Sequence, residues 1–199
     1  MHPELYFIYD SHCPWSYATS PLVKALSESF TEMEIHHWHC AHYNGTDSAG
    51  FLQIKEVEKQ SAQQFGQEHM RYADSPKDST MTANFMAWLQ SKQPEKVLPV
   101  LEALQHAHFI EGNPFGCKND FKGLIDTFKL SPSNKVFNET LSNEAQYQQS
   151  DIQELQAFMQ TSAFPALLLT YGDNAILLEH ARYLKKPQDL VKEVHKLLA

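Results

Sequence analysis

The first forty residues carry a strand, a helix and a second strand in immediate succession, and this order limits the folds open to the chain. Residues 4–10, ELYFIYD, form an aromatic and β-branched run that predicts a buried strand. Residues 13–30 place apolar side chains on one helical face, with a kink expected at Pro21. Residues 33–39, MEIHHWH, predict the second strand. A strand–helix–strand unit of this length pairs its strands in parallel, so the sequence predicts an α/β fold.

A long helical block separates this unit from a second set of strand patterns. The turn-rich stretch at 44–50 is followed by residues 51–161, which are polar, glutamine-rich and apolar at spacings of three and four. Two apolar runs then flank the turn residues 172–174, GDN, as in a β-hairpin. Residues 187–198 predict an amphipathic helix that closes the chain.

The length of 199 residues fits one domain, or a small domain that carries an insertion. We expect a discontinuous domain of residues 1–45 plus 162–199 that completes one mixed sheet. Residues 46–161 then form an all-helical insertion. Hydrophobic content of 42% and charged content of 20% are ordinary for a globular protein, so composition agrees with a packed core.

Charge and hydropathy limit the partners. The net charge of −8 argues against a nucleic-acid partner, because phosphate binding needs a basic face. The N-terminus lacks the basic region and long apolar core of a signal peptide, and no run of about 18 apolar residues offers a membrane span. Three scattered cysteines do not make a disulfide framework. We expect a cytoplasmic protein, bound to neither membranes nor nucleic acid, whose cysteines are thiols.

Cys13 stands at the junction of the first strand and the first helix, in the segment SHCPWSY. At the helix N-cap its sulfur faces the amides of the second and third helical residues, Trp15 and Ser16, and the positive end of the helix dipole. The Ser16 hydroxyl lies one turn on, and Pro14 is tolerated in the first turn. These effects favour the nucleophilic thiolate and predict a lowered pKa. The alternative is a buried cysteine that packs as a small apolar residue.

Several histidines invite other interpretations. His12 either lowers the pKa of Cys13 as an imidazolium or faces solvent. The segment HHWHCAH at 36–42 offers only two ligands on each face of a strand, whereas zinc needs three or four, so we expect no metal site there. His106 and His108 are two apart on a helix, so they diverge and are expected on the surface.

Aromatic and sulfur-containing side chains at helical spacing are expected to be core. The alternative is that they line a hydrophobic substrate cleft between the two parts of the chain. The residues concerned are Trp38, Phe85, Met86, Trp88 and Phe115.

The segment Cys13-Pro14-Trp15-Ser16 after a first strand resembles the active site of thioredoxin-like proteins of the DsbA family. It is closest to the branch related to FrnE and 2-hydroxychromene-2-carboxylate isomerase, and the resemblance covers most of the chain. AFPALLL at 163–169 resembles the family's cis-proline loop. The resemblance implies a thioredoxin-like fold, with Cys13 as the attacking cysteine, Ser16 at the resolving position and a cis Pro165 that faces Cys13. Substrate contacts are expected from His12, Pro14, Trp15, Phe164 and Pro165.

Ser16 departs from the two-cysteine pattern of the family, because a serine cannot form the internal disulfide that releases a substrate. The first hypothesis is thus a thiol–disulfide oxidoreductase that acts through Cys13 alone. A small thiol such as glutathione, or a protein thiol, would complete turnover, and no tightly bound cofactor is expected. Nothing in the sequence places Cys40 or Cys117 near Cys13 as a substitute resolving thiol.

Two other functions stay open, as does the oligomeric state. One is a glutathione-dependent isomerase or transferase, similar to chromene-carboxylate isomerase or the kappa-class glutathione transferases, whose members carry serine at the position of Cys13. The other is a non-catalytic module that traps partner proteins through Cys13.

Overall fold

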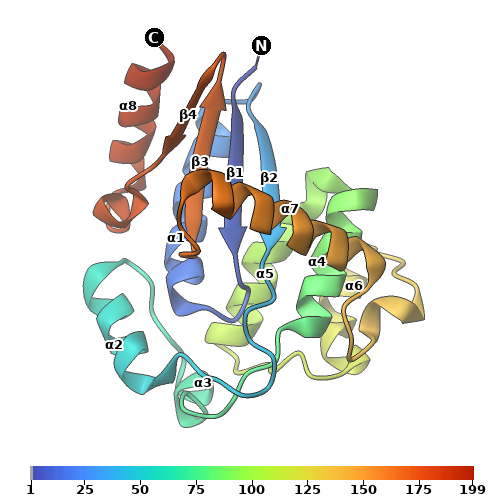
Figure 1. Ribbon diagram of the computed structural model, residues 1–199. Coiled ribbons are helices and arrows are strands. Elements are labelled where there is room, and N and C mark those ends of the chain that lie inside the picture. The colour runs from blue at the N-terminus through green and yellow to red at the C-terminus, as the bar shows by residue number, and fades with distance from the viewer. Residues whose placement is uncertain (1) are drawn as a thin grey trace.

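The computed structural model describes residues 2–199, and a four-stranded mixed sheet lies at its centre (Figure 1). β1 runs parallel to β2 and antiparallel to β3, and β4 pairs antiparallel with β3 at the edge. The strands, in the spatial order β2-β1-β3-β4, have the bounds β1 (Glu4–Tyr9), β2 (Glu34–His39), β3 (Ala166–Tyr171) and β4 (Asn174–Leu177). The predicted mixed sheet, made from both ends of the chain, is confirmed.

Helices fill most of the remaining chain, and α2 to α7 all fall between β2 and β3, where the helical block is predicted. α1 continues through Pro21 as a single helix. The α-helices are α1 (Pro14–Ser29), α2 (Gly50–Gln60), α3 (Gln67–Arg71), α4 (Thr80–Lys92), α5 (Val97–Phe109), α6 (Lys122–Phe128), α7 (Asn143–Met159) and α8 (Pro187–Leu198). The short 3₁₀ helices are η1 (Pro94–Lys96), η2 (Lys118–Phe121), η3 (Asn134–Phe137) and η4 (His180–Tyr183).

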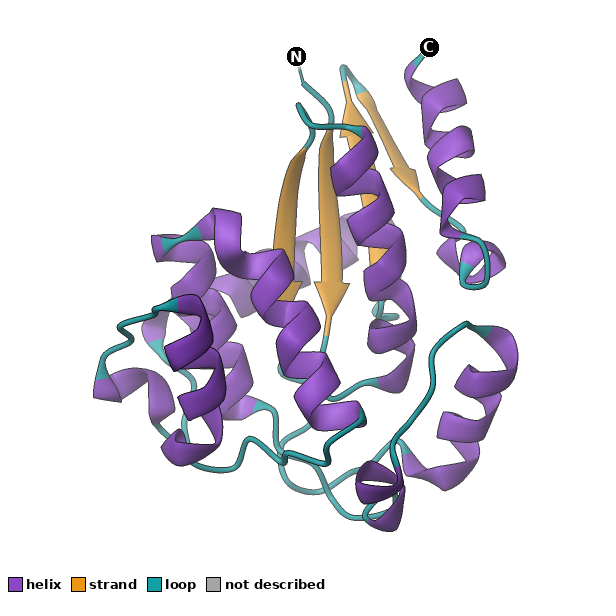
Figure 2. Cartoon of the chain, turned by 180° about the vertical axis from the view of Figure 1, so that it is seen from behind, coloured by secondary structure: helices purple, strands orange, loops and turns teal. Residues whose placement is uncertain are grey.

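The sheet is covered on both faces, which explains why β1 is apolar at nearly every position. α7 crosses one face, and α1 and α8 pack on the other (Figures 1 and 2). Successive side chains of a strand point to opposite faces. Accordingly Phe7 and Tyr9 join the large core with Leu22 of α1, whereas Ile8 packs with Ile152 of α7.

The large core also includes residues of the helical block, such as Val57 and Leu101. Phe85, Met86 and Phe115 are fully buried in it, which confirms that they are core rather than the lining of a cleft. Because one cluster joins both parts of the chain, the packing is continuous across the predicted insertion. The division into 1–45 plus 162–199 and 46–161 stays a prediction.

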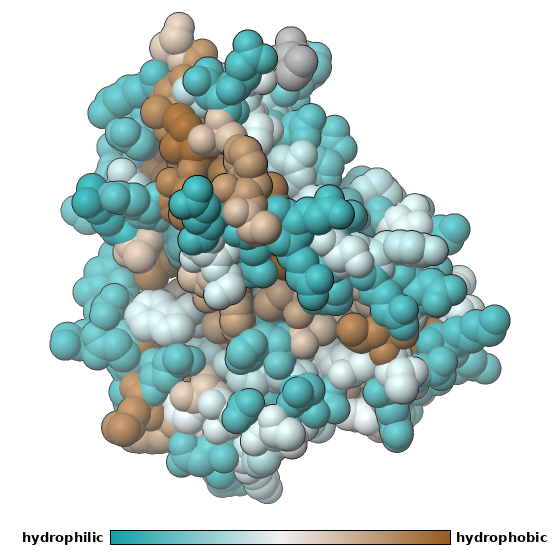
Figure 3. All heavy atoms as spheres, in the orientation of Figure 1, coloured by the Kyte–Doolittle hydropathy of each residue, from teal (hydrophilic) through white to brown (hydrophobic). Residues whose placement is uncertain are grey.

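The face seen in Figure 3 carries apolar side chains over β3 and β4, where α7 does not reach. Leu177 of β4 is 44% exposed. Within residues 2–199, no helix has the length and apolar character needed to cross a membrane.

Candidate active site

Cys13 lies in the turn between β1 and α1, at the end of the sheet that faces the helical block (Figure 1). Its amide donates to the Asp10 carbonyl at 3.1 Å, and its carbonyl accepts from the Tyr17 amide at 3.0 Å. Cys13 has extended backbone angles at the N-cap, and Pro14 opens α1. The predicted placement of the thiol at a helix N-terminus is therefore confirmed.

The Cys13 thiol is buried, with 4% of the residue exposed, and burial raises its pKa to about 11. The Ser16 amide and hydroxyl and the Trp15 amide oppose this rise, while the charge of Asp10 adds to it. Within residues 2–199, the Cys13 sulfur makes no side-chain capping hydrogen bond at the start of α1. The expected low pKa is thus wrong for this buried thiol. Desolvation outweighs the helix N-terminus, and the thiol form is favoured.

The Ser16 side chain interacts with two neighbours, Asp10 and Cys13. Its Oγ accepts a hydrogen bond from the Asp10 amide at 3.2 Å, and its hydroxyl lowers the pKa of Cys13. Ser16 is fully buried beside the turn. Burial of Cys13 agrees with the alternative of an apolar packing residue, but a site with Asp10 and Ser16 beside the sulfur is not an apolar one.

Asp10 is a buried carboxylate that the sequence interpretation missed. Burial alone would raise its pKa, but His39, His12 and the hydrogen bonds it accepts lower it. Four donors reach its oxygens: the amides of His12 (2.8 Å), His42 (2.7 Å) and Tyr43 (3.3 Å) and the hydroxyl of Ser79 (2.7 Å). Asp10 therefore stays anionic. Its hydrogen bonds join the turn after β1, residues 42–43 and Ser79. Its negative charge lies near the Cys13 thiol. The signal available in the sequence was a carboxylate directly after a buried strand.

His12 is buried, with 2% of the residue exposed, so the expectation that it faces solvent is wrong. Its Nε2 lies 3.2 Å from the Pro114 carbonyl, which can only accept, so Nε2 carries the proton. Nδ1 lies 3.0 Å from the Ser11 hydroxyl oxygen, which also lies 2.8 Å from His39 Nε2 and donates to Thr82 Oγ1 at 2.8 Å. Burial lowers the pKa of His12, so the other expectation, an imidazolium beside Cys13, is not met either.

The loop before β3 reaches the same end of the sheet. The Phe164–Pro165 peptide bond is cis, the isomer that the resemblance implies. Ala166 is opposite Ile8 in the ladder, which sets Pro165 beside the end of β1. The Phe164 ring lies 4.7 Å from the ring of His42, whose amide donates to Asp10. Trp15 is half-buried against the core.

A groove of about 520 Å³ runs beside Pro165, between the loop before β3 and the end of β4 with η4. His180 and Arg182 lie along it, and Arg182 pairs with Glu179 at 2.8 Å. The groove therefore offers backbone from the proline loop and a surface guanidinium.

The histidines at 36–42 do not converge. His37 and His39 are buried on the α1 face, whereas His36 stacks on Tyr6 at 4.5 Å between ring centroids. In the part of the chain that the structure describes, no three His, Cys, Asp or Glu side chains group as metal ligands do. His106 is exposed as expected, but His108 is buried, which contradicts its predicted surface position.

All three cysteines are free thiols. Cys117 is exposed, on the segment before η2. Cys40 follows β2, and its amide donates to the Tyr9 carbonyl at 2.7 Å. Burial raises the pKa of Cys40 well above its usual range, and the charges of Asp10 and Cys13 add to the rise. Cys40 is thus the second thiol at this end of the sheet, which its position in the sequence did not disclose.

Fold and site together define the class. A mixed sheet of βαβ and ββα segments, with a helical insertion between them and a cysteine at the N-cap of the first helix, is a thioredoxin-like fold of the DsbA type.

Solved structures of disulfide oxidoreductases share this fold. The cytosolic disulfide reductase DsbM from Pseudomonas aeruginosa, solved with GSH, is 19% identical with a TM-score of 0.82, over 98% of this chain and 98% of that chain. Another DsbM structure is 20% identical with a TM-score of 0.83, over 98% of this chain and 100% of that one. A variant of Pseudomonas aeruginosa DsbA is 12% identical with a TM-score of 0.58, over 98% and 85%. No protein-family model and no curated protein matches the sequence. At these identities the likeness establishes a shared fold.

Proposed function

We propose that the protein is a thiol–disulfide oxidoreductase that acts through Cys13 alone. The observation that carries the proposal is the cysteine at the N-cap of α1, with the Ser16 hydroxyl beside it and the Pro165 loop at the same end of the sheet. The likeness to DsbM, a disulfide reductase solved with GSH, supports this chemistry and glutathione as the small thiol. A cytoplasmic location is part of the proposal, and DsbM is described as cytosolic.

The reaction needs two exchange steps. The Cys13 thiolate attacks a substrate disulfide, forms a mixed disulfide and expels one substrate thiolate, which takes a proton from water. Ser16 has no sulfur, so a second thiol must attack the mixed disulfide. That step frees Cys13 and leaves a new disulfide between the released group and the incoming thiol. The two steps together take up one incoming thiol and release one substrate thiol, and the disulfide passes to the pair formed by the second substrate group and the incoming thiol.

The groove beside Pro165 is the proposed docking site for the substrate. Exposed backbone at the loop before β3 can pair with an extended peptide. Arg182 pairs with Glu179 through Nε, so its terminal N–H groups are the donors proposed for a substrate carboxylate. Phe164 and Trp15 are proposed to contact the substrate, together with His12 and Pro14, which flank Cys13 in the chain.

The test is formation and release of a glutathione adduct. Purified protein is oxidised with glutathione disulfide and digested, and the adducts are located by mass spectrometry. Reduction of a glutathionylated peptide by glutathione is then measured for the wild type, Cys13→Ala and the control Cys117→Ala. We expect an adduct on Cys13, loss of turnover in Cys13→Ala and full turnover in Cys117→Ala.

Turnover that persists in Cys13→Ala would overturn the proposal. Glutathione-dependent turnover of an aromatic carbonyl substrate without any adduct would favour the isomerase or transferase instead. Stable Cys13 conjugates with proteins, without turnover, would favour the trapping module.

A further inference from the structure

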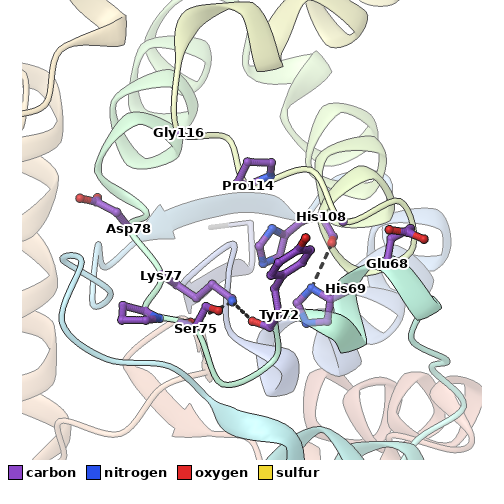
Figure 4. A pocket seen from close by; sticks show the side chains of 11 residues that line it. Glu68, His69, Tyr72, Ser75, Lys77, Asp78, His108, Pro114 and Gly116 are labelled. Atoms are coloured by element: carbon purple, nitrogen blue, oxygen red, sulfur yellow. Dashed lines mark hydrogen bonds between the residues drawn. The ribbon is translucent and has the colours of Figure 1, made fainter.

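A second cavity is lined by residues of the helical block, between positions 68 and 116. It has a volume of about 510 Å³ and is bounded by α3, residues 75–78 and the loop at 112–116. Figure 4 shows the side chains of His69, Tyr72, Lys77 and His108 around it. Pro114 lines the cavity, and its carbonyl accepts the hydrogen bond from His12. The centroids of the His12 and His108 rings lie 4.1 Å apart. The cavity therefore adjoins the residue that precedes Cys13.

His108 presents an unpaired acceptor. Its Nδ1 lies 2.7 Å from the Asn113 carbonyl, and a carbonyl can only accept, so Nδ1 carries the proton and Nε2 is a lone-pair acceptor. The residue is 2% exposed, and across residues 2–199 its Nε2 has no hydrogen-bond partner. A buried acceptor without a donor costs free energy and calls for an explanation in a native protein.

His69 has the same arrangement. Its Nδ1 donates to the His108 carbonyl at 3.1 Å, which leaves Nε2 as an acceptor. Burial lowers the pKa of His69 to about 4 and that of His108 well below its usual range. Both imidazoles are therefore neutral near pH 7. His108 Nε2 is closed off by its neighbours, so the lone pair offered to a ligand in the cavity is that of His69 Nε2.

Lys77 supplies the positive charge. Its Nζ donates to the carbonyls of Tyr72 at 2.5 Å and Ser75 at 2.9 Å, both neutral groups (Figure 4). Burial lowers the pKa of Lys77, and the negative charge of the nearby Asp74 opposes that shift.

In the part of the chain that the structure describes, neither of the two acids that line the cavity forms an ion pair with Lys77. Glu68 pairs with Arg71 at 2.9 Å, and Asp78 accepts from the Thr80 amide at 2.9 Å. The ammonium of Lys77 is thus placed for an anion from outside the chain.

We propose that this cavity binds a small molecule of the amino-acid or short-peptide class. Its carboxylate accepts from Lys77 Nζ, and an N–H group of the same molecule donates to His69 Nε2. A simple anion such as acetate would satisfy Lys77 but leave His69 Nε2 unpaired. Pro76 and Pro114 supply apolar walls for the rest of the ligand. The site is separate from the groove at Pro165, and its occupancy does not depend on exchange at Cys13.

The test uses S-methylglutathione, which has carboxylates and amide N–H groups but a capped sulfur that cannot react with Cys13. It is titrated into ¹⁵N-labelled protein, and backbone amide shifts are followed. We expect saturable shifts at Tyr72, Gly112 and Gly116, with the same affinity in Cys13→Ala. Lys77→Gln keeps a donor for the two carbonyls but removes the charge, and it should weaken binding at these amides by about tenfold or more. The matched control Lys192→Gln, on α8, should leave the affinity unchanged.

Two results would overturn the site. One is an absence of shifts at the cavity amides at millimolar ligand. The other is equal affinity in the wild type and Lys77→Gln. Acetate that shifts the same amides with equal affinity would overturn the ligand class, because the N–H group would then contribute nothing. Since binding is measured in Cys13→Ala as well, failure here is distinguishable from failure of the exchange reaction.

Discussion

Ser16 Oγ accepts a hydrogen bond from the Asp10 amide at 3.2 Å, across the turn that carries Cys13. The residue in the resolving position is therefore part of the framework of the site, although it has no sulfur. It closes the turn through the acceptor side of its hydroxyl and lowers the pKa of Cys13 through the donor side. This relationship and the buried charge of Asp10 set the behaviour of the thiol, and five predictions come from them.

The reactivity of Cys13 should rise steeply with pH. Its pKa is raised to about 11, so the thiolate fraction is small near neutrality and grows as the pH approaches that value. Alkylation by iodoacetamide, followed peptide by peptide by mass spectrometry, should still accelerate above pH 9. A plateau of the Cys13 rate between pH 6 and 8 would contradict this. The raised pKa also contributes stability that is present below about pH 8.5 and lost as the pH rises through 11.

Ser16→Cys should restore an internal disulfide. Residues three apart across the first turn of a helix have Cα atoms about 5 Å apart, within the range that a disulfide spans. Mild oxidation should then remove two hydrogen atoms from the protein and link residues 13 and 16, as peptide mapping would show. Ser20→Cys is the matched control, because position 20 lies about 10 Å along the helix from Cys13. A cross-link of equal yield in the control would argue against the proximity.

Ser16→Ala should destabilise the fold and slow the thiol. The buried Asp10 amide loses its acceptor, at a cost of about 1–3 kcal/mol in the free energy of unfolding. Loss of the hydroxyl near Sγ should also raise the pKa of Cys13 further. Urea denaturation and the pH profile of alkylation measure the two effects. Ser150→Ala, on the exposed surface of α7, is a serine control expected to leave both unchanged.

Asp10→Asn should separate reactivity from stability. Removal of the negative charge lowers the pKa of Cys13, so its alkylation near pH 8 should become faster. The amide cannot satisfy all the donors that meet the carboxylate, and each buried donor left unpaired costs about 1–3 kcal/mol. Slower alkylation in a variant that is still folded by circular dichroism would contradict the electrostatic role.

The same substitution should flatten the acid dependence of stability. The pKa of Asp10 is lowered in the folded protein, so its stabilisation is present above about pH 3.9 and is lost as the pH falls through the folded value. The free energy of unfolding of Asp10→Asn should therefore fall less between pH 5 and pH 3 than that of the wild type.

Local pattern was enough to predict most of the secondary structure. The first strand and helix, the hairpin around 172–174 and the last helix all lie where hydrophobic period and turn residues put them. The position of Cys13 at the N-cap was predicted for the same reason, since strand, turn and helix start are adjacent in the chain. These features depend on neighbours a few residues away.

The pKa of Cys13 and the groups around it were decided only by the tertiary structure. Desolvation comes from the packing of the turn beneath the helical block, and the charge of Asp10 is held by Tyr43 and Ser79, far along the chain. His108 approaches His12 from 96 positions away and is buried rather than exposed. The sequence by itself determined that a thiol stands at a helix N-terminus. Folding determined its pKa and its neighbours, because burial and long-range contacts do not appear in local periodicity.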